Sequence, residues 1–160
     1  MNKRFVSVAV LAAAISTPTV AQMSVEDQIE TRQAAYQFAS WNMGKIKAQT
    51  VDGSAAFDQN QVAAAAKAIA AVANSGMSVL YSRDSANDRA ENTRLKPNFF
   101  EEPMKVQEIA VSFVREANAL QELAAAGDQA AIARQFAKVG ETCKACHDNF
   151  ALYNNIKYPK

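Results

Sequence analysis

Apolar residues recur at helical spacing in four stretches of the chain, residues 24–48, 61–82, 103–126 and 129–154. Steps of three and four residues place such side chains on one face of a helix, where a core can cover them. In the last stretch this face comprises Ile132, Phe136, Val139, Cys143, Cys146 and Phe150. The pattern therefore predicts four amphipathic helices.

Residues at the ends of these stretches support the boundaries. Ser24 has an acidic residue three positions later, which is the spacing of a capping box. Pro103 suits a first helical turn, Gly127 a C-terminal cap and Asp128 an N-cap. Gly76 weakens the second helix only slightly. Because residues 127 and 128 alone join the last two helices, we expect these helices to be antiparallel neighbours.

The connection formed by residues 83–102 is long, charged and polar, and it ends in Lys-Pro-Asn-Phe-Phe. Long loops without secondary structure are often functional covers in compact domains. The alternative is a solvated crossover between the second and third helices. The sequence leaves both interpretations open.

Composition narrows the class of protein. The chain has 160 residues, enough for one domain, and 49% of them are hydrophobic. A formal net charge of +1 without a concentrated basic run argues against nucleic-acid binding. Abundant Ala and scarce Gly and Pro favour helix over sheet. We therefore predict an all-α fold, an antiparallel four-helix bundle.

The N-terminus has the features of a secretory signal. Lys3 and Arg4 precede an apolar stretch at residues 5–15, and small residues lead to Ala21. The alternative is a membrane anchor, but the apolar stretch is much shorter than the roughly 20 residues that span a bilayer. We expect residues 1–21 to be removed and residues 22–160 to form a periplasmic domain without a membrane span.

Cys143, Cys146 and His147 use both cysteines and the only histidine of the chain in the spacing C-x-x-C-H. This spacing is the attachment signature of c-type haem. Two thiols about one helical turn apart can each add to a haem vinyl group, and the adjacent imidazole can ligate the iron. The sequence predicts one haem c, attached through two thioethers and enclosed by the bundle.

Three other uses of this motif are open to the chain. A thioredoxin-like redox pair also has C-x-x-C, but it follows a strand, and nothing resembling a strand precedes Cys143. A structural disulfide would use the same two thiols. A zinc site would need a carboxylate as its fourth ligand, because the chain has only two Cys and one His.

Three segments together resemble the cytochrome c prime family of exported four-helix-bundle haem proteins. They are Gly-Glu-Thr-Cys-Lys-Ala-Cys-His-Asp at 140–148, Glu-Asp-Gln-Ile-Glu-Thr-Arg-Gln at 26–33, and Lys-Pro-Asn-Phe-Phe-Glu-Glu-Pro at 96–103. The resemblance covers essentially the whole chain after residue 21. It implies a haem iron held by a single histidine, here His147, with five ligands in all.

The resemblance also implies roles for three residues of the first helix. Arg32 and Gln33 match residues beside the haem edge and its propionates, and Tyr36 matches the bulky residue that closes the other face of the haem. Simpler interpretations of two of these residues remain: Arg32 could be a surface cation, and Tyr36 could be a packing residue. The family usually has a basic residue four positions after the histidine, whereas this chain has Ala151.

Some low-spin relatives supply a Met from the first helix as a second axial ligand. The candidate position lies near Ile29, which cannot ligate, Met23 lies too close to the terminus, and Met43 is expected in the core. Tyr36 could ligate iron only as a phenolate, and a phenol has a pKa near 10. Five-coordinate iron is therefore the favoured prediction.

We thus expect a haem protein that binds diatomic gases such as NO and CO and can exchange electrons with redox partner proteins. The alternative is a dedicated electron carrier with six-coordinate, low-spin iron. Enzyme activity is not expected, because the chain has no second histidine to act as general acid or base. A homodimer could form through an exposed Phe38 or Trp41.

Overall fold

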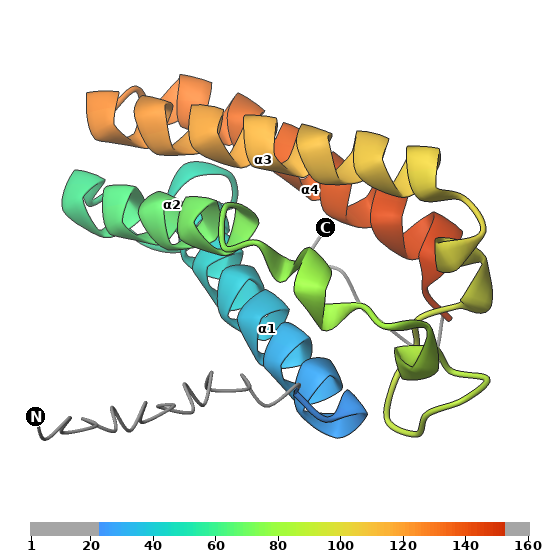
Figure 1. Ribbon diagram of the computed structural model, residues 1–160. Coiled ribbons are helices and arrows are strands. Elements are labelled where there is room, and N and C mark those ends of the chain that lie inside the picture. Colours follow the sequence, from blue (N-terminus) through green and yellow to red (C-terminus); the bar gives the residue numbers. More distant parts are fainter. Residues whose placement is uncertain (1–22, 153–160) are drawn as a thin grey trace, which may run out of the picture.

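Four helices form the molecule in the computed structural model, which describes residues 23–152 (Figure 1). They are α1 (Val25–Thr50), α2 (Gln59–Ala73), α3 (Pro103–Ala126) and α4 (Gln129–Phe150). No strand occurs between residues 23 and 152. The predicted all-α four-helix bundle is confirmed.

The core lies where the four helices meet. α1 packs on α2 and α4, and α3 packs on the same two helices. Alanines on α2 let the neighbouring helices approach closely, and each buried Ile or Leu contributes about 1.5–3 kcal/mol. The buried cluster comprises Met43, Ile46, Val62, Ala65, Ala66, Ile69, Ala117, Leu120, Ala124, Ile132 and Val139.

The caps form as the sequence predicts. Ser24 Oγ accepts a hydrogen bond from the Asp27 N–H at 3.0 Å, and Asp128 Oδ1 accepts one from the Ala131 N–H at 3.0 Å. Gly127 ends α3 with φ at +81°. This positive φ favours glycine at the turn between α3 and α4, and a Cβ there would also lie 2.7 Å from the end of the Gln59 side chain, which would have to shift.

The second helix is shorter than predicted. α2 ends at Ala73, and Gly76 has φ at +72°, a left-handed conformation that an α-helix does not continue through. A single turn of 3-10 helix, η1 (Met77–Leu80), follows. The prediction through residue 82 was wrong because the apolar spacing continues to Leu80, which is buried but belongs to η1 and not to α2.

The connection between α2 and α3 now comprises residues 74–102, because α2 ends earlier than predicted. It is a packed segment with two further 3-10 turns, η2 (Arg83–Ser85) and η3 (Pro97–Phe100). Ser85 is fully buried. Residues 94–96 run beside the end of α4: the Lys96 N–H donates to Phe150 O at 2.8 Å, and the Leu152 N–H donates to Arg94 O at 2.9 Å. α4 consequently ends at Phe150, earlier than the predicted residue 154, which lies outside the described residues.

Candidate haem site

The three residues of the C-x-x-C-H motif lie in the last turns of α4, at the end of the bundle that the connection closes (Figure 1). Cys143, Cys146 and His147 are each half-buried, and the two thiols are not paired with each other. Thr142, which precedes them, is buried and donates its hydroxyl to Val139 O at 2.8 Å. The helix thus presents all three groups from about one turn of backbone.

The connection between α2 and α3 holds this end of α4 in place. Lys96 Nζ donates to Asn149 O at 3.2 Å and to Asp148 O at 3.5 Å. The side-chain amide of Asn98 donates to Asn149 O at 3.3 Å. Terminal carbonyls of a helix lack partners within the helix and carry partial negative charge, so a lysine there is favourable. These bonds fix the turn that carries His147.

Burial sets the protonation of the motif. It raises the pKa of the Cys143 thiol, and together with the charge of Cys143 it raises that of Cys146 to about 11. Burial lowers the pKa of His147, and the charge of Arg94 lowers it further. The thiols are therefore protonated at neutral pH, and His147 is held in the neutral form that ligates metals.

This donor set fits a c-type haem better than the three alternatives. A redox-active C-x-x-C needs a thiol pKa below its ordinary value, and here both are raised. The thiols form no disulfide, and no group of three or more Cys, His, Asp or Glu within residues 23–152 could hold a metal ion. Cys143 and Cys146 would carry the thioethers, and His147 would ligate the iron.

Tyr36 lies on α1, which packs on α4, the helix that carries both thiols. Its hydroxyl accepts a hydrogen bond from the Tyr81 hydroxyl at 3.2 Å. Although 41% of the residue is exposed, burial around the hydroxyl raises the pKa of Tyr36, and the charges of Cys146 and Cys143 contribute in the same direction. The phenol therefore lies near both sulfur atoms of the motif.

Arg32 is buried one turn before Tyr36, with 5% of its surface exposed. Its guanidinium donates four hydrogen bonds of 2.8–3.0 Å to the connection: to Leu80 O, Ser85 Oγ, Ser85 O and Thr93 Oγ1. Burial lowers its pKa, against the opposing charges of Tyr81 and Tyr36. Exposed Gln33 donates to Asn92 O at 2.6 Å, where Asn92 has φ at +56°.

Comparison with known proteins decides the family. The family model for cytochrome c' matches residues 27–151. The chain belongs to the cytochrome c' family. It is 46% identical to cytochrome c' of Allochromatium vinosum over 84% of this chain and 86% of that protein. It is 48% identical to cytochrome c' of Rhodocyclus tenuis over 78% of this chain and 93% of that protein.

A solved cytochrome c' with a ligand-controlled dimer dissociation superimposes with a TM-score of 0.77 at 46% identity. The match covers 83% of this chain and all of that one. Cytochromes c' bind one covalently attached c-type haem, and this chain does so too. The identification thus confirms the predicted fold and cofactor.

For Arg32 the structure gives contacts that the resemblance to cytochrome c' does not imply. A guanidinium has five N–H groups, and four hydrogen bonds to the connection leave the Nε–H as the donor without one of these partners. Gln33 is likewise bonded to the connection. Both residues tie the connection to α1, and a role beside the propionates stays a prediction.

Two aromatic residues at the site were not singled out from the sequence. The ring of Tyr81 stacks on Phe99 with centroids 4.8 Å apart, and Phe99 meets Phe150 edge-on at 5.5 Å. Phe99 belongs to the Lys-Pro-Asn-Phe-Phe segment that supported the resemblance, whereas Tyr81 carries no motif. Since 45 residues separate it from Tyr36, no local spacing could have indicated the pair.

Proposed function

We propose that this cytochrome c' binds its haem iron through His147 alone and leaves the second axial position open to diatomic gases such as NO and CO. Haem iron supplies the centre at which a gas binds or an electron is held. The observation that carries the proposal is the side chain facing the thiols from α1, which is the phenol of Tyr36 and not a methionine or histidine.

The methionines of α1 and its N-terminal flank are placed unfavourably for ligation. Met43 belongs to the buried core cluster, as expected, and Met23 lies before the first turn of α1 with 43% of its surface exposed. Burial raises the pKa of Tyr36, so this side chain is a neutral phenol at pH 7 and a poor iron ligand. The chain has no second histidine for acid–base catalysis, so we propose gas binding and electron transfer without enzyme activity.

The rate of CO binding tests the proposal. Tyr36→Ala removes the ring that covers the open position, and we expect CO to associate faster with the ferrous protein than in the wild type. Met43→Leu is the matched control, because it changes the same helix inside the core. An unchanged rate in Tyr36→Ala would refute the gating role of Tyr36. Failure of wild-type protein to bind CO would support the six-coordinate electron carrier instead.

We also propose export to the periplasm. The support is the signal-like N-terminus, which lies outside the described residues. Within residues 23–152, no helix is long and apolar enough to cross a membrane. Mass spectrometry of protein from a periplasmic extract should give a chain that begins near Gln22 and carries one haem. An intact Met1 in the haem-loaded protein would contradict this.

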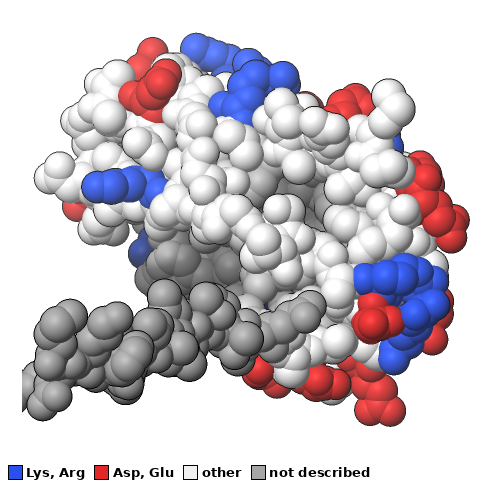
Figure 2. Space-filling view, in the orientation of Figure 1, with Lys and Arg blue, Asp and Glu red and all other residues white. Residues whose placement is uncertain are grey.

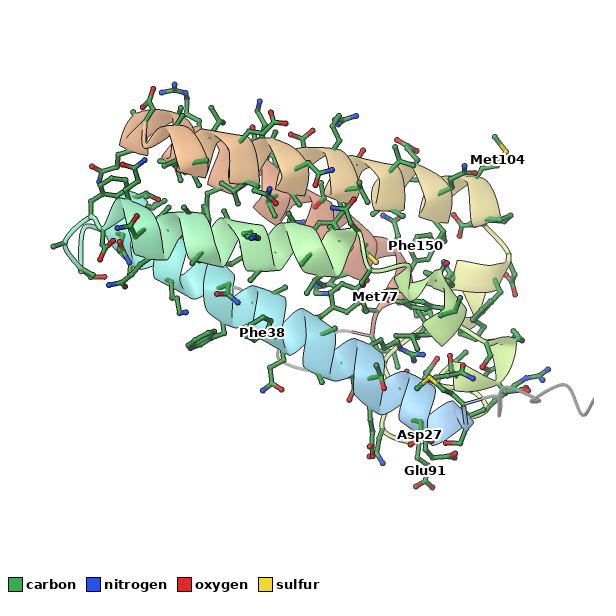
Figure 3. All side chains as sticks on the ribbon, turned by 60° about the vertical axis from the view of Figure 1, so that its left-hand side comes forward. Asp27, Phe38, Met77, Glu91, Met104 and Phe150 are labelled. Atoms are coloured by element: carbon green, nitrogen blue, oxygen red, sulfur yellow. The ribbon has the colours of Figure 1, made fainter. Side chains whose placement is uncertain are left out.

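A second copy of the chain is the partner we propose for the α1–α2 face. A groove of about 500 Å³ runs between α1, α2 and η1, and Figure 2 shows charged side chains mainly at the edges of this face. Phe38 projects from α1 away from α3 and α4 (Figure 3), and it stacks on Trp41 with centroids 5.9 Å apart. The two residues are 49% and 58% exposed.

The similar cytochrome c' with a ligand-controlled dimer dissociation supports this partner. Sedimentation velocity tests it with Trp41→Ala and, as a control, Met104→Ala, which removes another exposed apolar side chain from α3. We expect Trp41→Ala to weaken the dimer and Met104→Ala to leave it unchanged. A monomeric wild type at high concentration, or equal effects of both variants, would refute the proposed interface.

A further inference from the structure

Tyr81 is the second hydroxyl of the site, and the proposed function has not used it. It follows η1 on the connection, whereas Tyr36 lies on α1, so the pair joins two separate segments. The Tyr81 hydroxyl donates to the Tyr36 oxygen at 3.2 Å. One lone pair of the Tyr36 oxygen therefore accepts a hydrogen bond from a residue of the connection.

The ring of Tyr81 is held from several directions. It stacks on Phe99 with an interplanar angle of 15°, and the Arg32 guanidinium lies 5.0 Å from its centroid. The Tyr81 N–H donates to Ser78 O at 3.2 Å, and the preceding carbonyl, Leu80 O, accepts from Arg32 at 2.8 Å. Tyr36, in contrast, is 41% exposed. Tyr81 is thus the better anchored member of the pair.

A phenol has one proton, and its oxygen can also accept hydrogen bonds. When the Tyr36 oxygen accepts from Tyr81, the Tyr36 proton must point elsewhere, and the polarised O–H becomes a stronger donor. Tyr36 lies on α1, which packs on α4, and both sulfur atoms of the motif are near enough to affect its pKa, so the phenol lies on the side of the motif. The proton can then reach a ligand held between α1 and α4.

We propose that Tyr81 is a positioning residue, which directs the Tyr36 hydroxyl to donate its proton to a diatomic ligand in the haem site. The inference rests on the gas-binding function proposed above. It assigns to the connection between α2 and α3 a part in ligand discrimination, since a hydrogen-bond donor favours ligands that accumulate negative charge.

The test is Tyr81→Phe in two backgrounds, wild type and Tyr36→Phe. The substitution keeps the stacked ring and removes only the hydroxyl, and thermal unfolding checks that the fold is retained. In the wild-type background we expect the C–O stretching frequency of the CO adduct to rise and CO to dissociate about threefold faster, the effect of weakening one hydrogen bond. In the Tyr36→Phe background we expect no change in either quantity.

The two backgrounds separate positioning from a structural role. Equal shifts in both would show that Tyr81 acts on the ligand without Tyr36 and would overturn the proposal, as would no shift in either. If wild-type protein binds no CO, the gas-binding function fails by itself, and titration still tests the orientation of the pair.

That titration follows the ¹³Cζ NMR signal of Tyr36 in a low-spin ferrous form. This form is the CO adduct if the iron is five-coordinate, and the CO-free protein if the iron is six-coordinate. Of the chain's own groups, those that are charged or titratable and act on Tyr36 in the haem-loaded protein are Tyr81 and Arg32, because Cys143 and Cys146 are thioethers there. A donated hydrogen bond stabilises the phenolate, so Tyr81→Phe should raise the pKa of Tyr36 further. A lowered pKa would mean that Tyr36 donates to Tyr81, which would overturn the proposal.

Discussion

Arg32→Ala should destabilise the folded protein substantially, because it removes the hydrogen bonds that tie α1 to the connection between α2 and α3. The guanidinium has 5% exposure and donates four hydrogen bonds. Two of its acceptors belong to Ser85, which is fully buried, and a third is the carbonyl of Leu80, which is 8% exposed. Water can therefore replace the lost donors only after the connection has moved.

The magnitude follows from these acceptors. A buried acceptor left without a partner costs roughly 1–3 kcal/mol, and removal of a buried cation returns part of that amount. Three buried acceptors at about 1 kcal/mol each give a loss of about 3 kcal/mol, which corresponds to a fall in Tm of roughly 10 °C for a domain of this size. Gln33→Ala, which breaks one exposed bond to the same connection, should cost less than about 1 kcal/mol.

Guanidinium unfolding of the haem-loaded protein, followed by far-UV circular dichroism, measures both variants. Arg32→Lys keeps the positive charge but loses the planar guanidinium. We expect its free energy of unfolding to lie between those of wild type and Arg32→Ala. A loss no larger than that of Gln33→Ala would refute the clamping role. Unchanged stability with a shifted reduction potential would instead favour the role beside the propionates.

Further predictions concern the helix ends and the motif. Gly127→Ala should destabilise by about 1 kcal/mol or more, because φ is +81° and the new Cβ would meet Gln59. Gly140→Ala, in α4 with open space around its Cβ position, should stabilise by about 0.5–1 kcal/mol, and the same denaturant assay compares the two. If both substitutions changed the free energy of unfolding in the same direction, this reasoning would be wrong. His147→Ala should retain one haem by mass spectrometry but change the Soret band, and loss of the haem would show that attachment depends on the imidazole.

The parts of the fold that local chemistry controls could be predicted from the sequence. The helix 103–126 has the predicted bounds, because Pro103 and Gly127 act within their own turns. The end of α2 was placed wrongly because the Ala-rich sequence and Leu80 continue the helical pattern past Gly76, whose left-handed conformation interrupts the helix. There the packing of η1 on α1 overrides the local preference.

The site divides in the same way. Cys143, Cys146 and His147 could be proposed from the sequence, because their chemistry depends on neighbouring positions in one helix. The hydrogen-bond partners of Arg32 lie 48 to 61 positions away from it in the sequence. Tyr36 and Tyr81 are separated by 45 positions. Such pairings depend on how the connection folds against α1, and neither periodicity nor spacing encodes that.

The visible absorption spectrum of the ferrous protein, with and without CO, tests the central claim most directly. An open axial position opposite His147 predicts a broad high-spin spectrum that sharpens when CO is added. A sharp low-spin α-band that does not respond to CO would show a second protein ligand on the iron and would contradict the account.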